Sequence, residues 1–178
     1  MGRDKAALPL GDSTFLGRLV AEYSPAFDVW VSLGTPGQFP HPGARETVDR
    51  RPGQGPLAGL EAGFLDSGAE ALFLTATDLP LGRRDLALRL LERLGDHDAC
   101  VIRRRDGKIE PAFACYRRSC LPVLQELLDR ERRSMAGLLE ALDVCWVPEE
   151  ALEAWDLGRL LQNVNTPEDL RQLLDDML

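Results

Sequence analysis

The sequence predicts an α/β fold, a layered domain in which helices cover a mostly parallel sheet. Helix-like and strand-like segments alternate along the 178 residues, as they do in β–α–β units. The segment "EALFLTATD" (70–78) is a continuous apolar run of strand length, which is typical of a strand buried on both faces of a parallel sheet. No repeat or linker divides the chain, so residues 1–178 are expected to form one domain.

In the first half of the chain the pattern predicts two helices, each followed by strands. The segment "STFLGRLVAEY" (13–23) spaces apolar residues three or four apart, which predicts a helix. "FDVWVSL" (27–33) and "ETVD" (46–49) are typical of strands, and a loop rich in proline and glycine separates them. "PLAGLEAGFLD" (56–66) again has helical spacing and leads into the apolar strand 70–78.

The second half continues the alternation. "LALRLLERL" (86–94) predicts a helix, and "ACVIRR" and "IEPAFACYR" predict two strands joined tightly through "DGK". A last helix begins after Thr166, which is its expected cap, with Pro167 in the first helical position. The other elements expected here are helices at 121–128 and 134–142 and a strand at 144–147.

Composition and charge exclude several classes of protein. The formal net charge of -8 argues against a nucleic-acid-binding surface, and no apolar run approaches the roughly 20 residues of a membrane span. The four cysteines form no CxxC pair and lie among apolar residues, which indicates buried free thiols in a reducing cytoplasm. Two histidines are too few for a histidine-rich metal site.

Asp78 is the strongest candidate for a functional carboxylate. It directly follows the apolar strand, and in open α/β sheets ligands bind at the carboxyl ends of the strands. A carboxylate there can hold Mg²⁺, which prefers one or two carboxylates together with phosphate oxygens. The other interpretation, a carboxylate that only caps the next turn, fits this rule less well.

Glycines cluster around the expected start of helix 56–66, at positions 53, 55, 59 and 63. Glycine lets the backbone approach a ligand closely, and a helix N-terminus offers N–H groups to an anion or to a base edge. A tight turn and close helix–sheet packing explain the same glycines equally well. Neither the P-loop nor the GxGxxG pattern is present, which disfavours ATPases and dehydrogenases.

Two more segments carry polar residues that suit phosphate chemistry. Lys5 is one of only two lysines, the other being Lys108, and an ammonium group supplies a compact positive charge. Asn163 and Asn165 precede the last helix, where amides can ligate a metal or donate to phosphates. For these residues, solvent exposure, capping and turn formation are the commoner roles.

Six motifs in this order carry a resemblance that covers nearly the whole chain: "MGRDKAALPLG", "GPLAGLEAG", "LFLTATDLP", "IEPAFACYRR", "RRSMAGLLE" and "NVNTPEDL". Together they resemble the molybdenum cofactor guanylyltransferases, a MobA-type family of nucleotidyltransferases. The resemblance implies a Rossmann-like three-layer sandwich of the nucleotide-diphospho-sugar transferase type with a mostly parallel sheet. It also implies transfer of GMP from GTP to molybdopterin, with Mg²⁺ as cofactor and pyrophosphate as product.

The resemblance also implies roles for the matching residues. Lys5 and Asp78 would be catalytic, and Asp78 and Asn165 would ligate Mg²⁺. Asn163, Arg133 and Ser134 would lie on the pterin side. The nucleotide-binding residues would be Lys5, Asp49, Gly55, Pro56, Leu57, Gly59 and Asp78. The partners it implies are GTP, molybdopterin and other proteins of molybdenum cofactor biosynthesis, with no nucleic acid and no membrane.

Two departures from the family pattern matter. In the family, a strand and a loop "LAGGxSxR" precede the signature that contains Lys5, so the chain is expected to be truncated at its amino terminus and to lack a strand in the middle of the sheet. Ser32 stands where the family often has asparagine, so one polar contact to the nucleotide is not expected to follow the family pattern.

Two alternatives remain open on the sequence alone. One is a related nucleotidyltransferase that uses CTP on the same pterin or another NTP on another phosphorylated acceptor. The other is a catalytically silent domain that binds a nucleotide or a partner in molybdenum cofactor delivery. The motif "GPLAG" favours the guanine branch, and the presence of Lys5 and Asp78 speaks against a silent domain.

Overall fold

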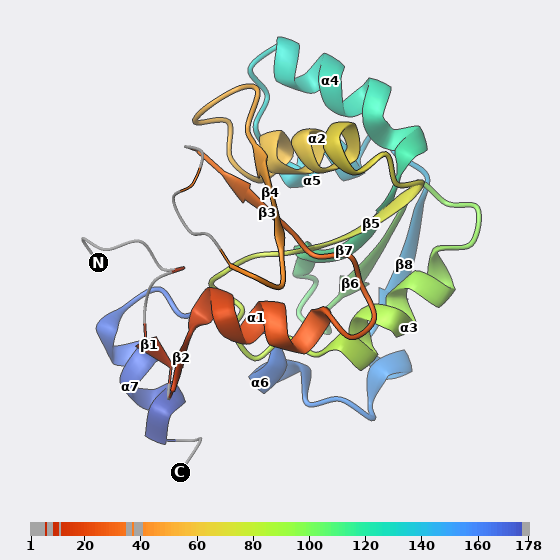
Figure 1. Cartoon of the computed structure of the whole chain (residues 1–178). Coiled ribbons are helices and arrows are strands. Elements are labelled where there is room, and N and C mark those ends of the chain that lie inside the picture. Colours follow the sequence, from red (N-terminus) through yellow and green to blue (C-terminus); the bar gives the residue numbers. More distant parts are fainter. Residues whose placement is uncertain (1–5, 7–8, 11, 35–36, 38–40, 176–178) are drawn as a thin grey trace.

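The protein is described by a computed structural model, which covers residues 6, 9–10, 12–34, 37 and 41–175 (Figure 1). Lys5 and the expectation of a preceding strand lie outside these residues. The strands are β1 (Pro9–Leu10), β2 (Ser13–Thr14), β3 (Trp30–Leu33), β4 (Arg45–Val48), β5 (Ala71–Thr75), β6 (Ala99–Arg103), β7 (Ile109–Arg117) and β8 (Val144–Pro148). The helices are α1 (Phe15–Tyr23), α2 (Pro56–Ser67), α3 (Arg84–Leu94), α4 (Leu121–Asp129), α5 (Met135–Leu139), α6 (Leu157–Leu160) and α7 (Pro167–Asp175), with short 3-10 turns η2 (Arg118–Cys120) and η3 (Glu149–Leu152).

The main sheet has four described strands in the order β5–β7–β6–β8. β6 and β8 are parallel, whereas β7 is antiparallel to both β5 and β6. Three of the four strands therefore run in one direction. The strand β7 returns from β6 through the turn 104–108, where Arg104 and Lys108 pair through their backbones at 2.7 Å, as the tight connection in the sequence predicted.

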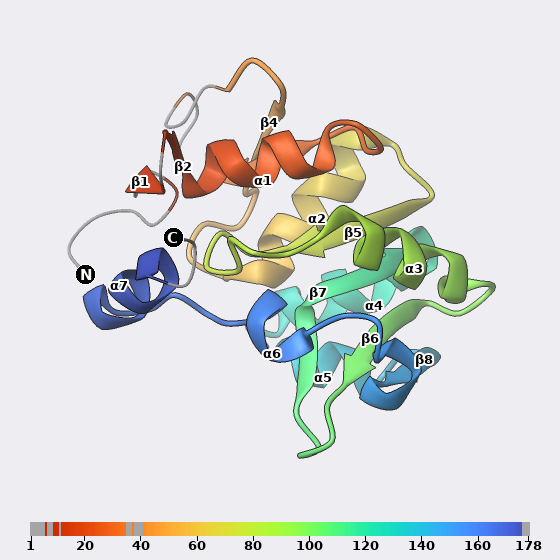
Figure 2. The same cartoon turned by 90° about the horizontal axis from the view of Figure 1, so that it is seen from below.

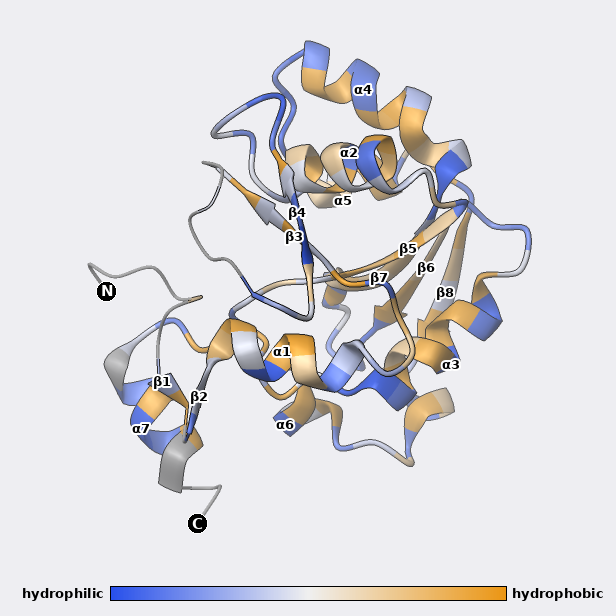
Figure 3. Cartoon of the chain, viewed as in Figure 1, coloured by the Kyte–Doolittle hydropathy of each residue, from blue (hydrophilic) through white to orange (hydrophobic). Residues whose placement is uncertain are grey.

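Helices cover both faces of this sheet, as Figure 1 shows. On one face α2, α4 and α5 pack against one set of alternating strand residues, and on the other face α3, η3 and α6 pack against the other set. Tyr116 and Phe113, both fully buried, belong to the two opposite clusters. The expected Rossmann-like three-layer α/β arrangement is confirmed, and the orange apolar faces of the helices turn toward the sheet in Figure 3.

A second, two-stranded sheet is formed by β3 and β4, which are parallel and pair from Trp30 with Arg45 to Leu33 with Val48. The helix α1 precedes β3 and buries Leu16, Leu19 and Val20. In Figure 2 the helix α1 lies next to β5, on the side of β5 that faces away from β7. This half of the fold joins the main sheet through α2, which leads directly from β4 to β5.

The structure departs from the sequence-based expectations at the strand β5 and in several short elements, namely β1, β2, η2, η3 and α6. The strand β5 was expected to be buried on both faces, yet all five of its residues are only half-buried, because β5 is an edge strand among the described strands. The elements η3 and α6 were not expected, since each spans only four residues. No helix in the described part of the chain is long and apolar enough to cross a membrane.

Candidate functional site

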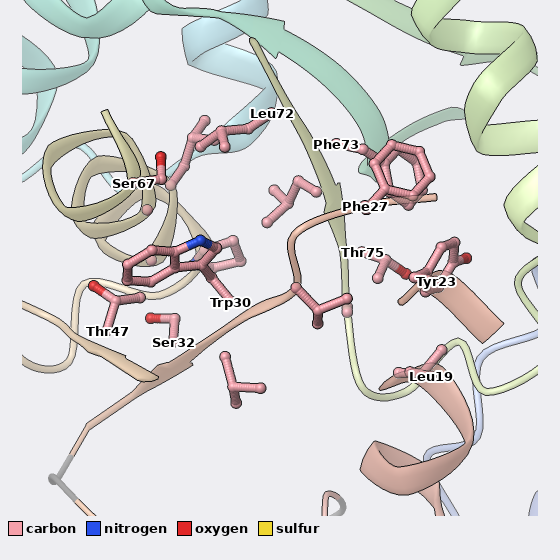
Figure 4. Close-up of a pocket in the computed structure, with 18 of the residues that line it drawn as sticks. Leu19, Tyr23, Phe27, Trp30, Ser32, Thr47, Ser67, Leu72, Phe73 and Thr75 are labelled. Atoms are coloured by element: carbon pink, nitrogen blue, oxygen red, sulfur yellow. The ribbon is translucent and has the colours of Figure 1, made fainter. Parts of the chain in front are cut away.

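A cavity of about 550 Å³ separates β3 from β5. The helix α1 contributes Leu19 and Tyr23 to its wall, and α2 contributes Gly59 and Gly63 from the opposite side. Figure 4 shows the aromatic rings of Tyr23, Phe27 and Phe73 gathered on the side of β5, with Trp30, Ser32 and Thr47 on the side of β3. The candidate site is built along this cavity because residues at the carboxyl ends of both strands reach it.

Asp49 lies at the carboxyl end of β4, where its N–H donates to the carbonyl of Leu33 at 3.1 Å and extends the ladder by one residue. Its Oδ1 accepts a short hydrogen bond from the Ser32 hydroxyl. A Cβ on Gly59 would lie 3.0 Å from the Ser32 Oγ, so a larger residue at position 59 would push against this pair. The sequence-predicted residues Asp49 and Gly59 are therefore brought together, and Ser32 joins them.

The loop 50–55 turns the chain from β4 into α2. Gly53 and Gly55 adopt positive φ angles of 77° and 65°, a region that favours glycine. Gly55 is the N-cap of α2 and Pro56 opens the helix, so no side chain caps its first turn. Pro56 has no N–H and Ala58 donates to the carbonyl of Gly55 at 3.0 Å, so the N–H groups of Gly55 and Leu57 are the donors here that suit an anion or a polar edge of a ligand. Gly55 and Pro56 both line the cavity, whereas the sequence-predicted Leu57 is fully buried in the core and only its backbone can serve a ligand.

Asp78 follows β5 after Thr75, Ala76 and Thr77, three residues that line the same cavity. The carbonyl of Asp78 accepts a hydrogen bond of 2.9 Å from the N–H of Val164. This contact places the segment 163–165 beside Asp78, although the two lie far apart in the sequence. The two sequence-predicted metal ligands, Asp78 and Asn165, thus come from adjacent segments.

Asp78 and Asn165 carry side-chain oxygens, the type of ligand that Mg²⁺ prefers. The described residues contain no group of three or more His, Cys, Asp or Glu that could hold a metal ion. Mg²⁺ commonly binds through only one or two protein ligands and completes its octahedron with waters and substrate phosphates. A carboxylate and an amide oxygen are ligand types that match that requirement, and the assignment of Asp78 and Asn165 as the ligands stays a prediction.

The three residues predicted on the pterin side lie in two segments, Asn163 before α7 and Arg133 and Ser134 between α4 and α5. Asn163 is exposed next to the buried Val164. The Ser134 hydroxyl caps α5 by accepting from the Gly137 N–H at 3.1 Å. Arg133 was predicted on the pterin side, and its Nη1 donates to the carbonyl of Gly53 at 3.3 Å. The α4–α5 turn and the loop 50–55 are therefore neighbours.

The sequence reasoning missed the charged residues that hold the loop 50–55. Arg50 donates to Asp66 of α2 at 2.7 Å, and the Thr47 hydroxyl donates to the same carboxylate. The hydrogen bond from Arg50 is the main reason that the pKa of Asp66 is lowered, and Thr47 adds to it. Arg51 pairs with Glu61, a carboxylate only 2% exposed. The signal in the sequence was a glutamate between Leu60 and Ala62, within the otherwise apolar stretch 57–65 of the helix.

The chain was compared with known families and proteins. A family model described as "MobA-like NTP transferase domain" matches residues 1–145. A probable molybdenum cofactor guanylyltransferase from Carboxydothermus hydrogenoformans is 33% identical over 98% of this chain and 88% of its own length.

Two solved structures share the fold. The molybdopterin-guanine dinucleotide biosynthesis protein A from Archaeoglobus fulgidus superposes with a TM-score of 0.84 at 24% identity, over 99% of this chain and 91% of that chain. The 2-C-methyl-D-erythritol 4-phosphate cytidylyltransferase from Thermus thermophilus superposes with a TM-score of 0.71 at 20% identity, over 97% of this chain and 93% of that chain. The arrangement of helices and strands is thus that of known nucleotidyltransferase folds.

Proposed function

Because the chain belongs to the MobA-like NTP transferase domain family, we propose that it transfers GMP from GTP to molybdopterin, forming molybdopterin guanine dinucleotide and pyrophosphate. The observation that carries this proposal is that Asp49, Gly55 and Gly59 line the same cavity as the residues leading to Asp78. One ligand with a base at one end and phosphates at the other suits such a site. The name of the relative from Carboxydothermus hydrogenoformans, a probable molybdenum cofactor guanylyltransferase, supports guanylyl transfer to the molybdenum cofactor.

The guanine nucleotide binds along β3, β4 and the start of α2. Asp49 and Ser32 present a carboxylate and a hydroxyl at the ends of these strands, and both groups can hydrogen-bond the polar edge of a base or a ribose. Gly59 lies close to this pair, which keeps side chains out of the way of the nucleotide. The backbone N–H of Gly55, which lines the same cavity, adds a donor at the start of α2.

Asp78 and Asn165 would hold Mg²⁺, and the sequence resemblance assigns Lys5 to the nucleotide phosphates. When bound, Mg²⁺ neutralises the negative charge of the nucleotide phosphates and orients them. Lys5, which lies outside the described residues, supplies a further positive charge. The backbone bond between Val164 and Asp78 fixes the two ligand-bearing segments relative to each other, so the ligands need little rearrangement when the nucleotide binds.

The reaction itself needs no protein nucleophile. An oxygen of the terminal phosphate of molybdopterin forms a bond to the α-phosphorus of GTP, while the bond from that phosphorus to the oxygen bridging to the β-phosphate breaks. The electron pair of the broken bond leaves with pyrophosphate. The protein contributes by aligning the two substrates and stabilising the charge on the phosphate oxygens. Arg133, Asn163 and Ser134 lie on the side of the pterin.

Residues 1–178 act as one nucleotidyltransferase domain in this proposal, and the reaction takes place in the cytoplasm. The thiols of Cys100, Cys115 and Cys120 are buried and free, which suits the reducing conditions there.

Titration calorimetry with GTP, CTP and ATP in the presence of Mg²⁺ tests the nucleotide choice, and release of pyrophosphate in the presence of molybdopterin tests the transfer. The variant Asp78→Ala should lower the transfer rate by at least about 100-fold, because electrostatic stabilisation of the reacting phosphates is lost. Asp96→Ala, which removes an exposed carboxylate in the turn after α3, should leave binding and transfer unchanged.

Each other outcome points to a different function. A preference for CTP over GTP would move the protein to the cytidylyl branch. Binding of GTP without release of pyrophosphate would indicate a silent nucleotide-binding domain. Equal transfer by Asp78→Ala and by the wild-type protein would contradict the role given to Asp78.

A further inference from the structure

The side chain of Arg51 connects the loop 50–55 to two helices, α2 and α4. Its Nε lies 3.3 Å from Oε2 of Glu61 on α2, and its Nη1 lies 2.5 Å from Oδ1 of Asp129 at the end of α4. The side chain of Arg51 is only 27% exposed. A guanidinium has donors pointing in several fixed directions, so a single arginine can fix the position of its own loop relative to both helices.

Glu61 is an unusual residue for the place it occupies. It is 2% exposed on a helix whose neighbouring residues Leu57, Leu60 and Phe64 form the core. Its Oε1 accepts from the Gln125 amide at 3.2 Å. Burying a carboxylate removes its favourable solvation, and an apolar side chain of similar volume is often at least as stable as a buried ion pair. Packing of the core therefore does not explain a carboxylate at this position, which indicates that Glu61 has another role.

A second contact reaches the same loop from the α4–α5 turn. Arg133 donates to the carbonyl of Gly53, two residues after Arg51. In this turn Glu131 has a φ of 55°, a left-handed conformation that is costly for residues other than glycine. The conformation is held by backbone bonds from Glu131 to Leu128 at 3.0 Å and from Arg132 to Leu127 at 2.9 Å. Strained residues of this kind often occur at functional sites.

We propose that Arg51 is a positioning residue for the nucleotide, with Glu61 and Asp129 as its two anchors. It holds the loop 50–55 so that Gly55, which lines the cavity, presents its backbone to the nucleotide in one fixed orientation. Arg51 contacts neither substrate, and its effect passes through Gly53 and Gly55. The inference rests on the proposed function for the identity of the ligand, but the loop itself is tested without one.

Hydrogen exchange of the nucleotide-free protein, followed by mass spectrometry, measures the order of residues 50–59. In Glu61→Gln and Arg51→Met this exchange should be about tenfold faster than in the wild-type protein, because the loop loses its anchor. The exchange of β6 should stay unchanged. Arg51→Lys keeps the charge and should recover part of the protection.

The kinetic test separates positioning from a general loss of structure. In the same variants the KM for GTP should rise about tenfold with kcat changed less than about twofold, because the displaced groups bind the nucleotide before and during the reaction alike. Glu149→Gln is the matched control, since it breaks a half-buried ion pair with Arg104 at the other side of the sheet. It should change neither the exchange of residues 50–59 nor the KM.

Exchange in residues 50–59 that is equal in Glu61→Gln, Arg51→Met and the wild-type protein would overturn the inference. Faster exchange spread over the whole chain would overturn it too, since Glu61 would then serve stability only. If the wild-type protein bound no GTP, only the proposed function would fail, because the exchange experiment needs no nucleotide.

Discussion

The sheet β5–β7–β6–β8 and the sheet β3–β4 differ in how completely their strands are covered. In β6 the residues from Ala99 to Ile102 are fully buried between two layers of helices. In β3 only Leu33 is buried, while Ser32 is exposed. The cavity of about 550 Å³ lies between the two sheets, so β3 and β5 both have side chains that face it instead of packed neighbours.

This difference means that the two sides of the candidate site have unequal support. The strand β5, which leads to Asp78, is paired with β7 and backed by the large core clusters. The pair of Asp49 and Ser32 rests on β3 and β4, whose small cluster contains Ala6, Leu16 and Val20. Regions with few buried apolar contacts open at low free energy, so we expect the nucleotide-base side of the site to be the more adaptable one.

The largest test of this comparison removes one aromatic ring from each region. Phe113→Ala should lower the free energy of unfolding by about 3–5 kcal/mol, because Phe113 is fully buried in the main sheet. Trp30→Ala should cost only about 1 kcal/mol, because Trp30 of β3 is half-buried and lines the cavity. Urea unfolding of both variants measures the two values. Similar losses would contradict the idea that the two regions are unequally packed.

Alkaline pH should act mainly on the main sheet. Burial raises the pKa of Cys100 and of Cys120 to about 12 from an ordinary value of 9.0, and Cys145 adds to the effect at Cys100. Above pH 9 the unfolded chain loses these protons while the folded protein keeps them, so stability is present below that pH and is lost as the pH rises toward 12.

The expected slope is about 1.4 kcal/mol per pH unit for each thiol in this range. Urea unfolding between pH 8 and pH 11 in the presence of a reductant checks it. Cys120→Ala should make the slope smaller by the contribution of one thiol, about 1.4 kcal/mol per pH unit. A slope that is the same with and without Cys120 would show that its burial does not persist in solution.

The smallest effect comes from adding one methylene group to each region. Val31→Ile extends a half-buried side chain that lines the cavity and should stabilise the protein by about 0.8 kcal/mol. Val101→Ile makes the same change at a fully buried position of β6 and should destabilise it by about 1–3 kcal/mol, because a close-packed core has no room. Changes of the same sign in both variants would contradict the comparison.

Much of the site could be predicted from the sequence because it follows local rules. Asp78 comes shortly after an apolar strand, and Gly55 and Pro56 begin a helix, so their positions near the edge of a sheet follow from strand and helix signals along the chain. The cap at Thr166 is confirmed as well, since its hydroxyl accepts from the Asp169 N–H at 3.1 Å. The Lys5 assignment and the truncated amino terminus stay predictions.

The rest depended on contacts between segments distant in the sequence. The bond from Val164 to Asp78 joins residues 86 positions apart, and the pair of Arg51 and Asp129 joins residues 78 positions apart. No periodicity marks such pairs, because either partner alone reads as an ordinary polar residue. The half-burial of β5 could not be foreseen either, since an apolar run shows what a strand can bury and not which neighbours it will have.

The sequence by itself determined the order of helices and strands, the family, and the residue types available for nucleotide and metal binding, because these follow from spacing and from motifs along the chain. The tertiary structure decided which of these residues meet, how the loop 50–55 is anchored, and where a cavity remains between two sheets. Those features depend on how separate elements pack in space, which the local pattern of a chain does not specify.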